Sequence, residues 1–237
     1  MDNMPARADI EGATTNVWLR APRSTRDRAA VNRERIVDAA VVLLDREGAD
    51  GLTMRRLAEQ LGTGSTTLYW HVETKDDVLD LAYDAIAGEI RLPSKPSGNW
   101  RKDVLALAVE WRATILRHPW AATLLGRPLL GPNVLERLEF LQAALARAGL
   151  EGDGLQAATW ALVSQVMGSA AAEVTFVMRP EDRRAANDHV RANSDRYPTL
   201  AAGDYGGDSD WTANFIRGIE YLIEGLGATA PTRRARR

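Results

Sequence analysis

The feature that most constrains this chain is a 24-residue stretch, LTMRRLAEQLGTGSTTLYWHVETK, which runs from residue 52 to residue 75. It predicts two short helices joined by a glycine-containing turn, and the second helix ends in Tyr69, Trp70 and His71. Leu68 can be buried, but so short a helix cannot bury both aromatic rings. Hydroxyls, aromatic rings and a histidine are therefore expected together on the surface of this helix. A helix-turn-helix that lays its second helix in the major groove of DNA has this arrangement.

Helical periodicity continues on both sides of this stretch. Residues 32–47 carry an apolar stripe at helical spacing, and Gly48 supplies a left-handed residue to end that helix. Thr53 and Thr74 are predicted N-caps, and acidic residues follow Thr74, where a helix dipole favours them. The predicted helices of this half are 32–47, 53–61, 65–71 and a fourth that runs from residue 74 to before Pro93.

A linker, LPSKPSG at residues 92–98, divides the chain into two predicted domains. No convincing strand follows it, and a proline- and glycine-rich span at 180–210 predicts a long loop with a short helix around 182–193. We therefore expect an all-α protein, with an N-terminal three-helix helix-turn-helix domain and a larger C-terminal helical domain. The predicted parts are a disordered basic extension at 1–31, a DNA-binding domain at 32–91, an effector-binding and dimerisation domain at 99–228, and a disordered tail at 229–237. The predicted helices of the effector-binding domain are 100–117, 134–148, 155–178 and 211–226.

Composition excludes several classes of protein. The chain has 237 residues, of which 45% are hydrophobic, enough for one or two domains with real cores. It has no cysteine, so disulfides and thiolate metal sites are excluded. Residues 154–172 carry no charge, but their Gln, Thr, Ser and Gly content predicts a helix buried between protein surfaces rather than a membrane span. Because no apolar run follows Met1, we expect a cytoplasmic protein with no membrane partner.

The sequence lacks the familiar motifs of catalysis. It contains no Gly-x-Ser-x-Gly, no phosphate-binding glycine loop and no histidine pair at i, i+4. His118 and His189 are scattered and do not make a metal site. We therefore expect no enzymatic activity, no metal and no cofactor. A DNA-binding or scaffolding protein without an effector stays open as the alternative to a ligand-responsive regulator, although the large, tryptophan-rich second domain argues against it.

Two helices of the second domain are predicted to form a homodimer interface. The helix at 155–178 has almost no polar face, so a monomer would leave a large apolar surface in water. Small residues, among them Gly168 and Ala171, would let helices approach closely. Together with the helix at 211–226, two copies would build a four-helix interface.

From Arg35 to Leu81 the chain resembles the DNA-binding domain of the TetR (tetracycline repressor) family of bacterial transcription regulators. The resemblance rests on a helix-turn-helix between helices of the right lengths, and on TTLYWHV, which is close to the repressor that gives the family its name. From Trp100 onward the chain resembles the family's effector-binding domain more loosely, most clearly at the Gly-Arg-Pro of residues 126–128. The resemblance implies a homodimeric regulator, either a repressor or an activator. The favoured reading is a repressor released from a palindromic double-stranded DNA operator by a small-molecule effector.

The resemblance also implies which residues contact DNA. Arg55 would read a base edge, because arginine can bond guanine through two N–H groups. Hydroxyls at the start of the recognition helix would reach bases or phosphates, and Tyr69 and Lys75 would anchor the DNA backbone. Thr66 stands where the name-giving repressor has proline, so that protein's base preference does not carry over. For the arginines of residues 20–28, contact with DNA and a plain disordered extension both stay open. The implied set is Thr53, Arg55, Ser65, Thr66, Thr67, Tyr69, Trp70, His71 and Lys75.

The expected effector is an apolar or aromatic molecule rather than a magnesium–tetracycline chelate. The positions that match the ligand- and metal-binding residues of the name-giving repressor are Arg91, Leu107, Trp111 and either Leu124 or Leu125. Leucine cannot ligate a hard cation, and an arginine beside the ligand repels one. The predicted pocket residues, with core packing as the alternative for each, are Trp111, Trp120, Leu124, Leu125, Trp160, Gln165, Met167 and Phe176.

Overall fold

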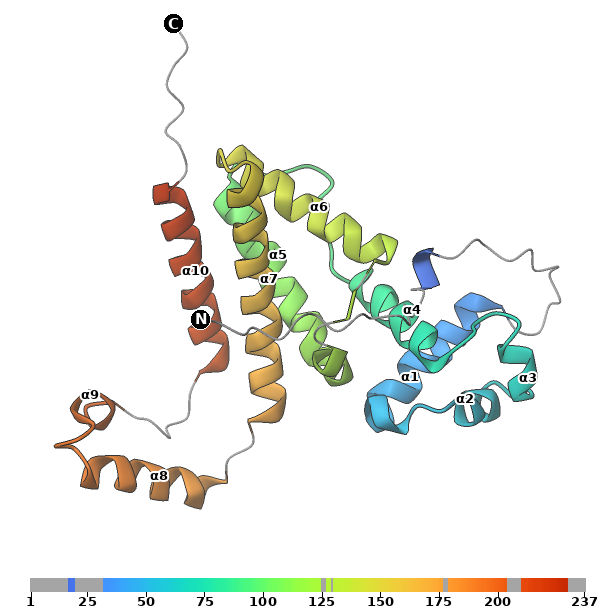
Figure 1. Cartoon of the computed structure of the whole chain (residues 1–237), viewed down its shortest axis with the longest axis horizontal. Coiled ribbons are helices and arrows are strands. Elements are labelled where there is room, and N and C mark those ends of the chain that lie inside the picture. Colours follow the sequence, from blue (N-terminus) through green and yellow to red (C-terminus); the bar gives the residue numbers. More distant parts are fainter. Residues whose placement is uncertain are drawn as a thin grey trace, which may run out of the picture.

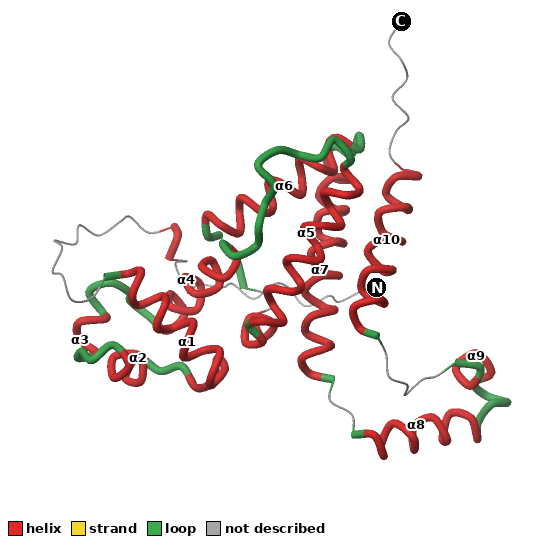
Figure 2. Tube along the Cα trace, turned by 180° about the vertical axis from the view of Figure 1, so that it is seen from behind, coloured by secondary structure: helices red, strands yellow, loops and turns green. Residues whose placement is uncertain are grey.

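The structure is a computed structural model that describes residues 17–19, 32–124, 127–128, 130–176, 179–203 and 210–229. All regular elements within these residues are helical, so the all-α prediction is confirmed. Figure 1 shows two bodies side by side, with α1 to α4 in one and α5, α6, α7 and α10 in the other. The same division is visible from behind in Figure 2, where α8 and α9 lie apart from both bodies.

The first body contains the four helices that the sequence predicted, with predicted caps at three of them. They are α1 (Arg33–Gly51), α2 (Met54–Gln60), α3 (Ser65–Leu68) and α4 (Lys75–Ala87). The Thr53 side chain accepts a hydrogen bond from the Arg56 N–H, and Thr74 forms a capping box with Asp77. Gly48 interrupts α1 with a φ of 72°, which is the left-handed conformation predicted for it.

The second body is built around α5 (Trp100–Arg117), which packs against α6 (Pro132–Arg147), α7 (Gly152–Thr175) and α10 (Trp211–Thr229). A short 3₁₀ helix, η2 (Pro119–Leu124), follows α5 and lies against α1 of the first body. Proline begins η2 and α6 because its missing N–H is one that a helix start leaves unpaired in any case. The two bodies therefore meet along α1, α4, η2 and α6.

Four sequence predictions need correction. The recognition helix was predicted to reach residue 71, but regular α-helix ends at Leu68. The short helix predicted around 182–193 is confirmed as α8 (Pro180–Ala192), but the predicted loop beyond it contains a second helix, α9 (Pro198–Ala201). In the predicted disordered extension, η1 (Val17–Leu19) buries Val17 to 7% exposure against α4, and the rest of residues 1–31 lies outside the described residues. The predicted tail begins inside α10, whose last residue is Thr229, and residues 230–237 are also outside the described residues.

No single helix in the described part of the chain combines the length and the apolar character of a membrane span. Among the described helices, α7 and α8 pass such a test as a pair, and this pair is bent by 111°.

Candidate DNA interface and effector site

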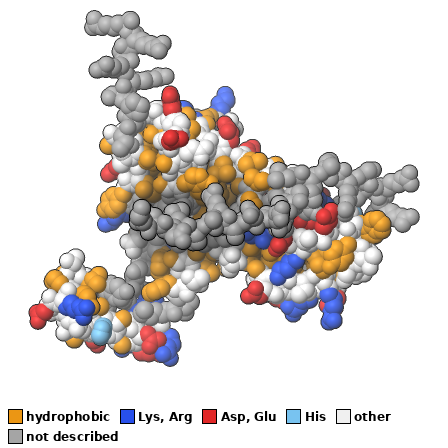
Figure 3. All heavy atoms as spheres, in the orientation of Figure 1, with side chains coloured by type: hydrophobic (Ala, Val, Ile, Leu, Met, Phe, Trp, Pro, Cys, Tyr) orange, Lys and Arg blue, Asp and Glu red, His pale blue; other side chains and the backbone are white. Residues whose placement is uncertain are grey.

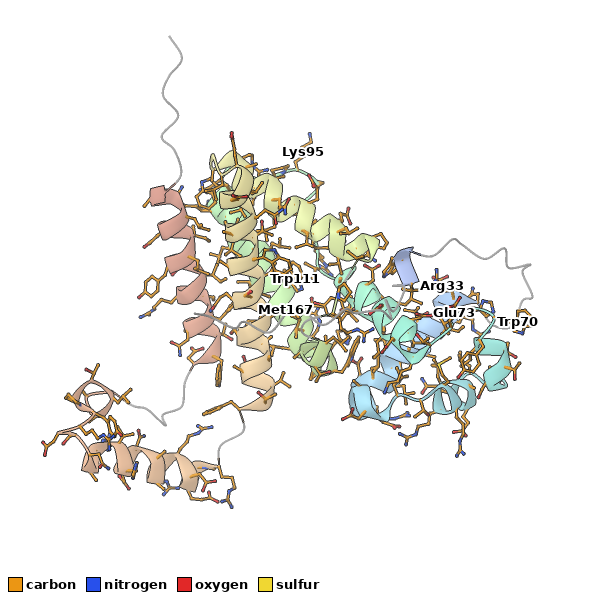
Figure 4. All side chains as sticks on the ribbon, in the orientation of Figure 1. Arg33, Trp70, Glu73, Lys95, Trp111 and Met167 are labelled. Atoms are coloured by element: carbon orange, nitrogen blue, oxygen red, sulfur yellow. The ribbon has the colours of Figure 1, made fainter. Side chains whose placement is uncertain are left out.

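The recognition region is a short turn fixed from beneath by buried leucines. Leu57 of α2 and Leu68 of α3 are 0% exposed, and Val72 is 1% exposed just after the turn. Above them, the Tyr69 and Trp70 side chains are 48% and 71% exposed. Figure 4 places Trp70 at the end of the first body farthest from the second. Rings this exposed on a well-anchored backbone suit contact with another molecule rather than core packing.

The backbone explains why the recognition helix is shorter than predicted. After Leu68 the N–H groups of Trp70 and His71 bond the carbonyls three residues back, at 3.4 Å and 2.8 Å. Such bonds tighten the last turn of a helix. Trp70 and His71 therefore stand at the tip of a turn, while Ser65, Thr66 and Thr67 form the helical part. Periodicity could not distinguish these two geometries over so few residues.

The other predicted DNA contacts lie next to this turn in the chain. Arg55 is exposed on α2, and its Nε lies 3.0 Å from a carboxylate oxygen of Glu59. An exposed pair of this kind contributes less than about 1 kcal/mol, so Arg55 can leave Glu59 for DNA at little cost. Thr53 is exposed before α2, and Lys75 is half-buried at the start of α4.

An apolar cavity lies in the second body between α5, α6 and α7. Its empty volume is about 230 Å³, which includes space open to solvent. Of the predicted pocket residues that the structure describes, only Trp111 lines it. The other lining residues were missed because apolar side chains at helical spacing look the same whether they fill a core or border a cavity. The full lining is Val104, Leu107, Ala108, Trp111, Leu141, Leu162, Val163 and Val166.

The remaining predicted pocket residues have other surroundings. Trp120 is buried, and its indole N–H donates to Asp45 of α1 at 2.7 Å. Trp160 and Phe176 are 66% and 57% exposed, and Phe176 packs edge-on against Trp211 with ring centroids 5.9 Å apart. The exposure of these two rings does not support a place in the cavity wall.

Three further predicted pocket residues complete the set. Leu124 is buried in η2, whereas Leu125 lies outside the described residues. Gln165 is half-buried on α7 and faces Gly218 of α10. Met167 is buried and lies close to Trp111 in the middle of the molecule (Figure 4).

Ion pairs and hydrogen bonds join α4 to the second body. The Arg127 guanidinium bonds Asp76 at 3.0 Å and Asp80 at 2.8 Å, while Arg137 of α6 bonds the carbonyl oxygens of Gly88 and Ile90, at 3.1 Å and 2.8 Å, just past α4. Burial raises the pKa of Asp80 above its ordinary value, although Arg127 opposes the rise. These contacts hold α4 along its whole length.

A second junction joins α1 to η2. One carboxylate oxygen of Asp45 lies 2.7 Å from His118 Nδ1 and 2.7 Å from Trp120 Nε1. The other ring nitrogen of His118 faces Glu89, with Nε2 at 3.2 Å from Oε1. A displacement of η2 would therefore be felt by α1 and by the end of α4. No cluster of three metal-ligating side chains occurs among the residues described.

Two protein families match this chain in consecutive regions. Residues 36–82 match the bacterial regulatory proteins of the tetR family. Residues 92–230 match the tetracyclin repressor-like C-terminal domain. The first matched region lies within the first body, and the second covers the second body together with α8 and α9.

Relatives align over nearly the whole chain. An HTH-type transcriptional regulator of Saccharopolyspora erythraea is 47% identical over 223 residues, which cover 93% of this chain and 94% of that protein. The HTH-type transcriptional repressor DrrR1 of Streptomyces coeruleorubidus is 31% identical over 243 residues, covering 95% and 88%. The class D tetracycline repressor of Escherichia coli is 41% identical over 93 residues, but these are only 38% of this chain and 42% of that protein.

Solved structures share the same architecture. ActR from Streptomyces coelicolor without ligand superimposes with a TM-score of 0.79 at 29% identity, covering 86% of this chain and 98% of that one. ActR in complex with (S)-DNPA gives a TM-score of 0.76 at 30% identity, covering 85% and 100%.

Proposed function

The chain belongs to the TetR family of bacterial transcription regulators, and we propose that it is a homodimeric repressor that an uncharged small molecule releases from a palindromic operator. Its relatives are helix-turn-helix transcription regulators and repressors, which makes it a DNA-binding regulator of the same type. The observation that carries the DNA-binding assignment is the pair of exposed rings, Tyr69 and Trp70, on a turn anchored by a fully buried Leu68. No enzymatic activity is proposed.

We propose that residues 32–91 bind DNA through the nine side chains identified above. Hydroxyls of Ser65, Thr66 and Thr67 at the start of the helix would reach base edges or phosphates, and the rings of the turn would pack on the groove wall. Lys75 would pair with a phosphate. In a symmetric dimer the two turns would enter the major groove one helical turn apart on one face of the operator.

The dimer interface is proposed on α7 and α10 of residues 99–228. An uncharged row of small residues is exposed along α7, at Ala157, Ala161, Ser164 and Gly168, with Trp160 beside it at 66% exposure. On α10, Tyr221 is also 66% exposed. Two copies of these helices would form a four-helix bundle that removes the rings from water and lets the small residues come close.

We place the effector in the apolar cavity between α5, α6 and α7. ActR has been solved with (S)-DNPA and with actinorhodin, which supports a ligand-binding role for the corresponding domain here. A ligand changes DNA affinity only if it binds the non-DNA conformation more tightly. The junctions at Arg127 and at Asp45 are where movement of the second body would reorient α4 and α1.

Operator binding tests the proposal directly. Duplexes selected from random DNA, or taken from upstream of the chain's own gene, should bind in gel shifts with strong salt dependence. Replacing Tyr69 by alanine should weaken all selected duplexes about 10- to 150-fold, since a hydrogen bond to a charged phosphate contributes about 1.5–3 kcal/mol. The matched control is Tyr197→Ala on the far side of the molecule, which should leave affinity unchanged. Failure to find any salt-sensitive duplex would overturn the assignment.

A further inference from the structure

The buried phenol of Tyr83 has weak hydrogen-bonding partners. Tyr83 lies on α4 and is 1% exposed, and its hydroxyl donates to the thioether sulfur of Met167 at 3.5 Å. The Trp111 side chain lies near the same hydroxyl. Burial raises the pKa of Tyr83 above its ordinary value, which keeps the phenol a hydrogen-bond donor. A thioether is a weak acceptor, so much of the hydrogen-bonding capacity of this O–H is unused.

Trp111 connects this group of three side chains to the apolar cavity. Its ring lines the cavity wall, and its side chain also interacts with Tyr83 on α4. All of the other lining side chains are aliphatic, so none of them can pair with a charged ligand. The empty volume of about 230 Å³ includes space open to solvent, so the enclosed part of the cavity is smaller still. A ring-sized effector must therefore displace part of the wall.

We propose that Tyr83 and Trp111 determine which effectors this chain recognises, namely uncharged ring molecules that carry one strong hydrogen-bond acceptor such as a ketone oxygen. This rests on the proposed function, in which the cavity binds the effector. The ligand ring shifts Trp111, and its oxygen replaces the Met167 sulfur as the acceptor of the Tyr83 O–H. The exchange of a weak acceptor for a strong one favours the ketone over a hydrocarbon of equal shape.

This change of hydrogen-bond acceptor at Tyr83 would affect the DNA-binding body through α4. Tyr83 is followed directly by Asp84, whose carboxylate accepts from the backbone N–H of Val134 at 3.0 Å at the start of α6. Asp80, nearly one turn earlier, is held by Arg127. A shift of Tyr83 therefore acts on α4, the helix whose Asp80 and Asp84 carboxylates bond the second body.

Two probes of matched shape test the proposal. Acetophenone and ethylbenzene share a ring and a two-carbon chain, but only acetophenone has an acceptor oxygen. Calorimetric titration should show that Tyr83→Phe weakens acetophenone about tenfold and changes ethylbenzene by less than about twofold, the loss expected for one hydrogen bond. Tyr197→Phe removes an exposed hydroxyl that lies outside the proposed interfaces, and neither probe should respond to it. Retained operator binding by both variants shows that they fold.

A second variant changes the acceptor of the same hydrogen bond. Met167→Leu removes the sulfur and leaves the Tyr83 O–H without its partner, so acetophenone should bind more tightly and ethylbenzene should not. Equal effects of Tyr83→Phe on both probes would overturn the role of the hydroxyl while leaving the cavity as a binding site. Absence of binding by either probe to the unmodified protein would instead overturn the cavity itself, and the proposed effector site with it.

Discussion

Two surfaces of this molecule expose aromatic rings to a similar degree, yet they suit different partners. Tyr69 and Trp70 are 48% and 71% exposed at the recognition turn, while Trp160 and Tyr221 are both 66% exposed on α7 and α10. Exposure alone therefore does not distinguish a DNA interface from a protein interface. The neighbouring side chains make the distinction, as the space-filling view illustrates.

Around the recognition turn the neighbours are hydroxyls and cations, which can bond phosphates and base edges. Figure 3 shows Lys and Arg side chains along the lower edge of the first body, among acidic side chains and near apolar patches. Along α7 the exposed neighbours of Trp160 are glutamine, alanine and serine, which carry no charge. A polyanion needs the first kind of surface, and a second copy of the chain fits the second.

The largest effect expected is on the α7 surface. Replacing Ala161 by arginine should dissociate the dimer and abolish operator binding, because symmetry would bury two unpaired charges at a cost of about 3–5 kcal/mol each. Light scattering at micromolar concentration measures the mass. Ala146→Arg, also at an exposed alanine but on α6, should leave the mass at two chains. A mass of one chain for the unmodified protein would show that the α7 surface does not bind a second copy.

Two substitutions at the recognition turn should affect stability and DNA binding to different extents. Leu68→Ala removes a fully buried side chain and should cost about 2–5 kcal/mol of unfolding free energy, with loss of binding as a consequence. Trp70→Ala, at 71% exposure, should change the unfolding free energy by no more than about 0.5 kcal/mol and still weaken operator binding. Denaturant titration and gel shifts on both variants measure this. Unchanged affinity in Trp70→Ala would remove this ring from the interface.

The smallest effect expected concerns Lys75, at the edge of the same surface. Its replacement by alanine should weaken every duplex alike and reduce the slope of log K against log salt by about 0.9, the value for one phosphate contact. Lys102→Ala on α5 removes an exposed charge from the second body and should leave the slope unaltered. A change in base preference, rather than in slope, would mean that Lys75 reads bases.

Local patterns were sufficient for much of the first body. Thr53 and Thr74 cap helices because their side chains bond an N–H only three residues away, and Gly48 takes a left-handed φ because it has no Cβ. Such features depend on neighbours in the chain. The early end of α3 was missed because a 3₁₀-type turn and one more turn of α-helix differ only in whether each N–H bonds the carbonyl three or four residues back.

What the sequence by itself determined is the helical class, the helix-turn-helix and the exposed rings of the recognition turn, all of which follow from residues within about two dozen positions of each other. Only the tertiary structure decided that Trp111 borders a cavity while Trp160 lies on the surface, and that Tyr83 bonds Met167 from 84 positions away. The physical reason is that a buried face and an interface carry the same helical periodicity. Which apolar side chains meet is fixed only when helices distant in sequence pack together.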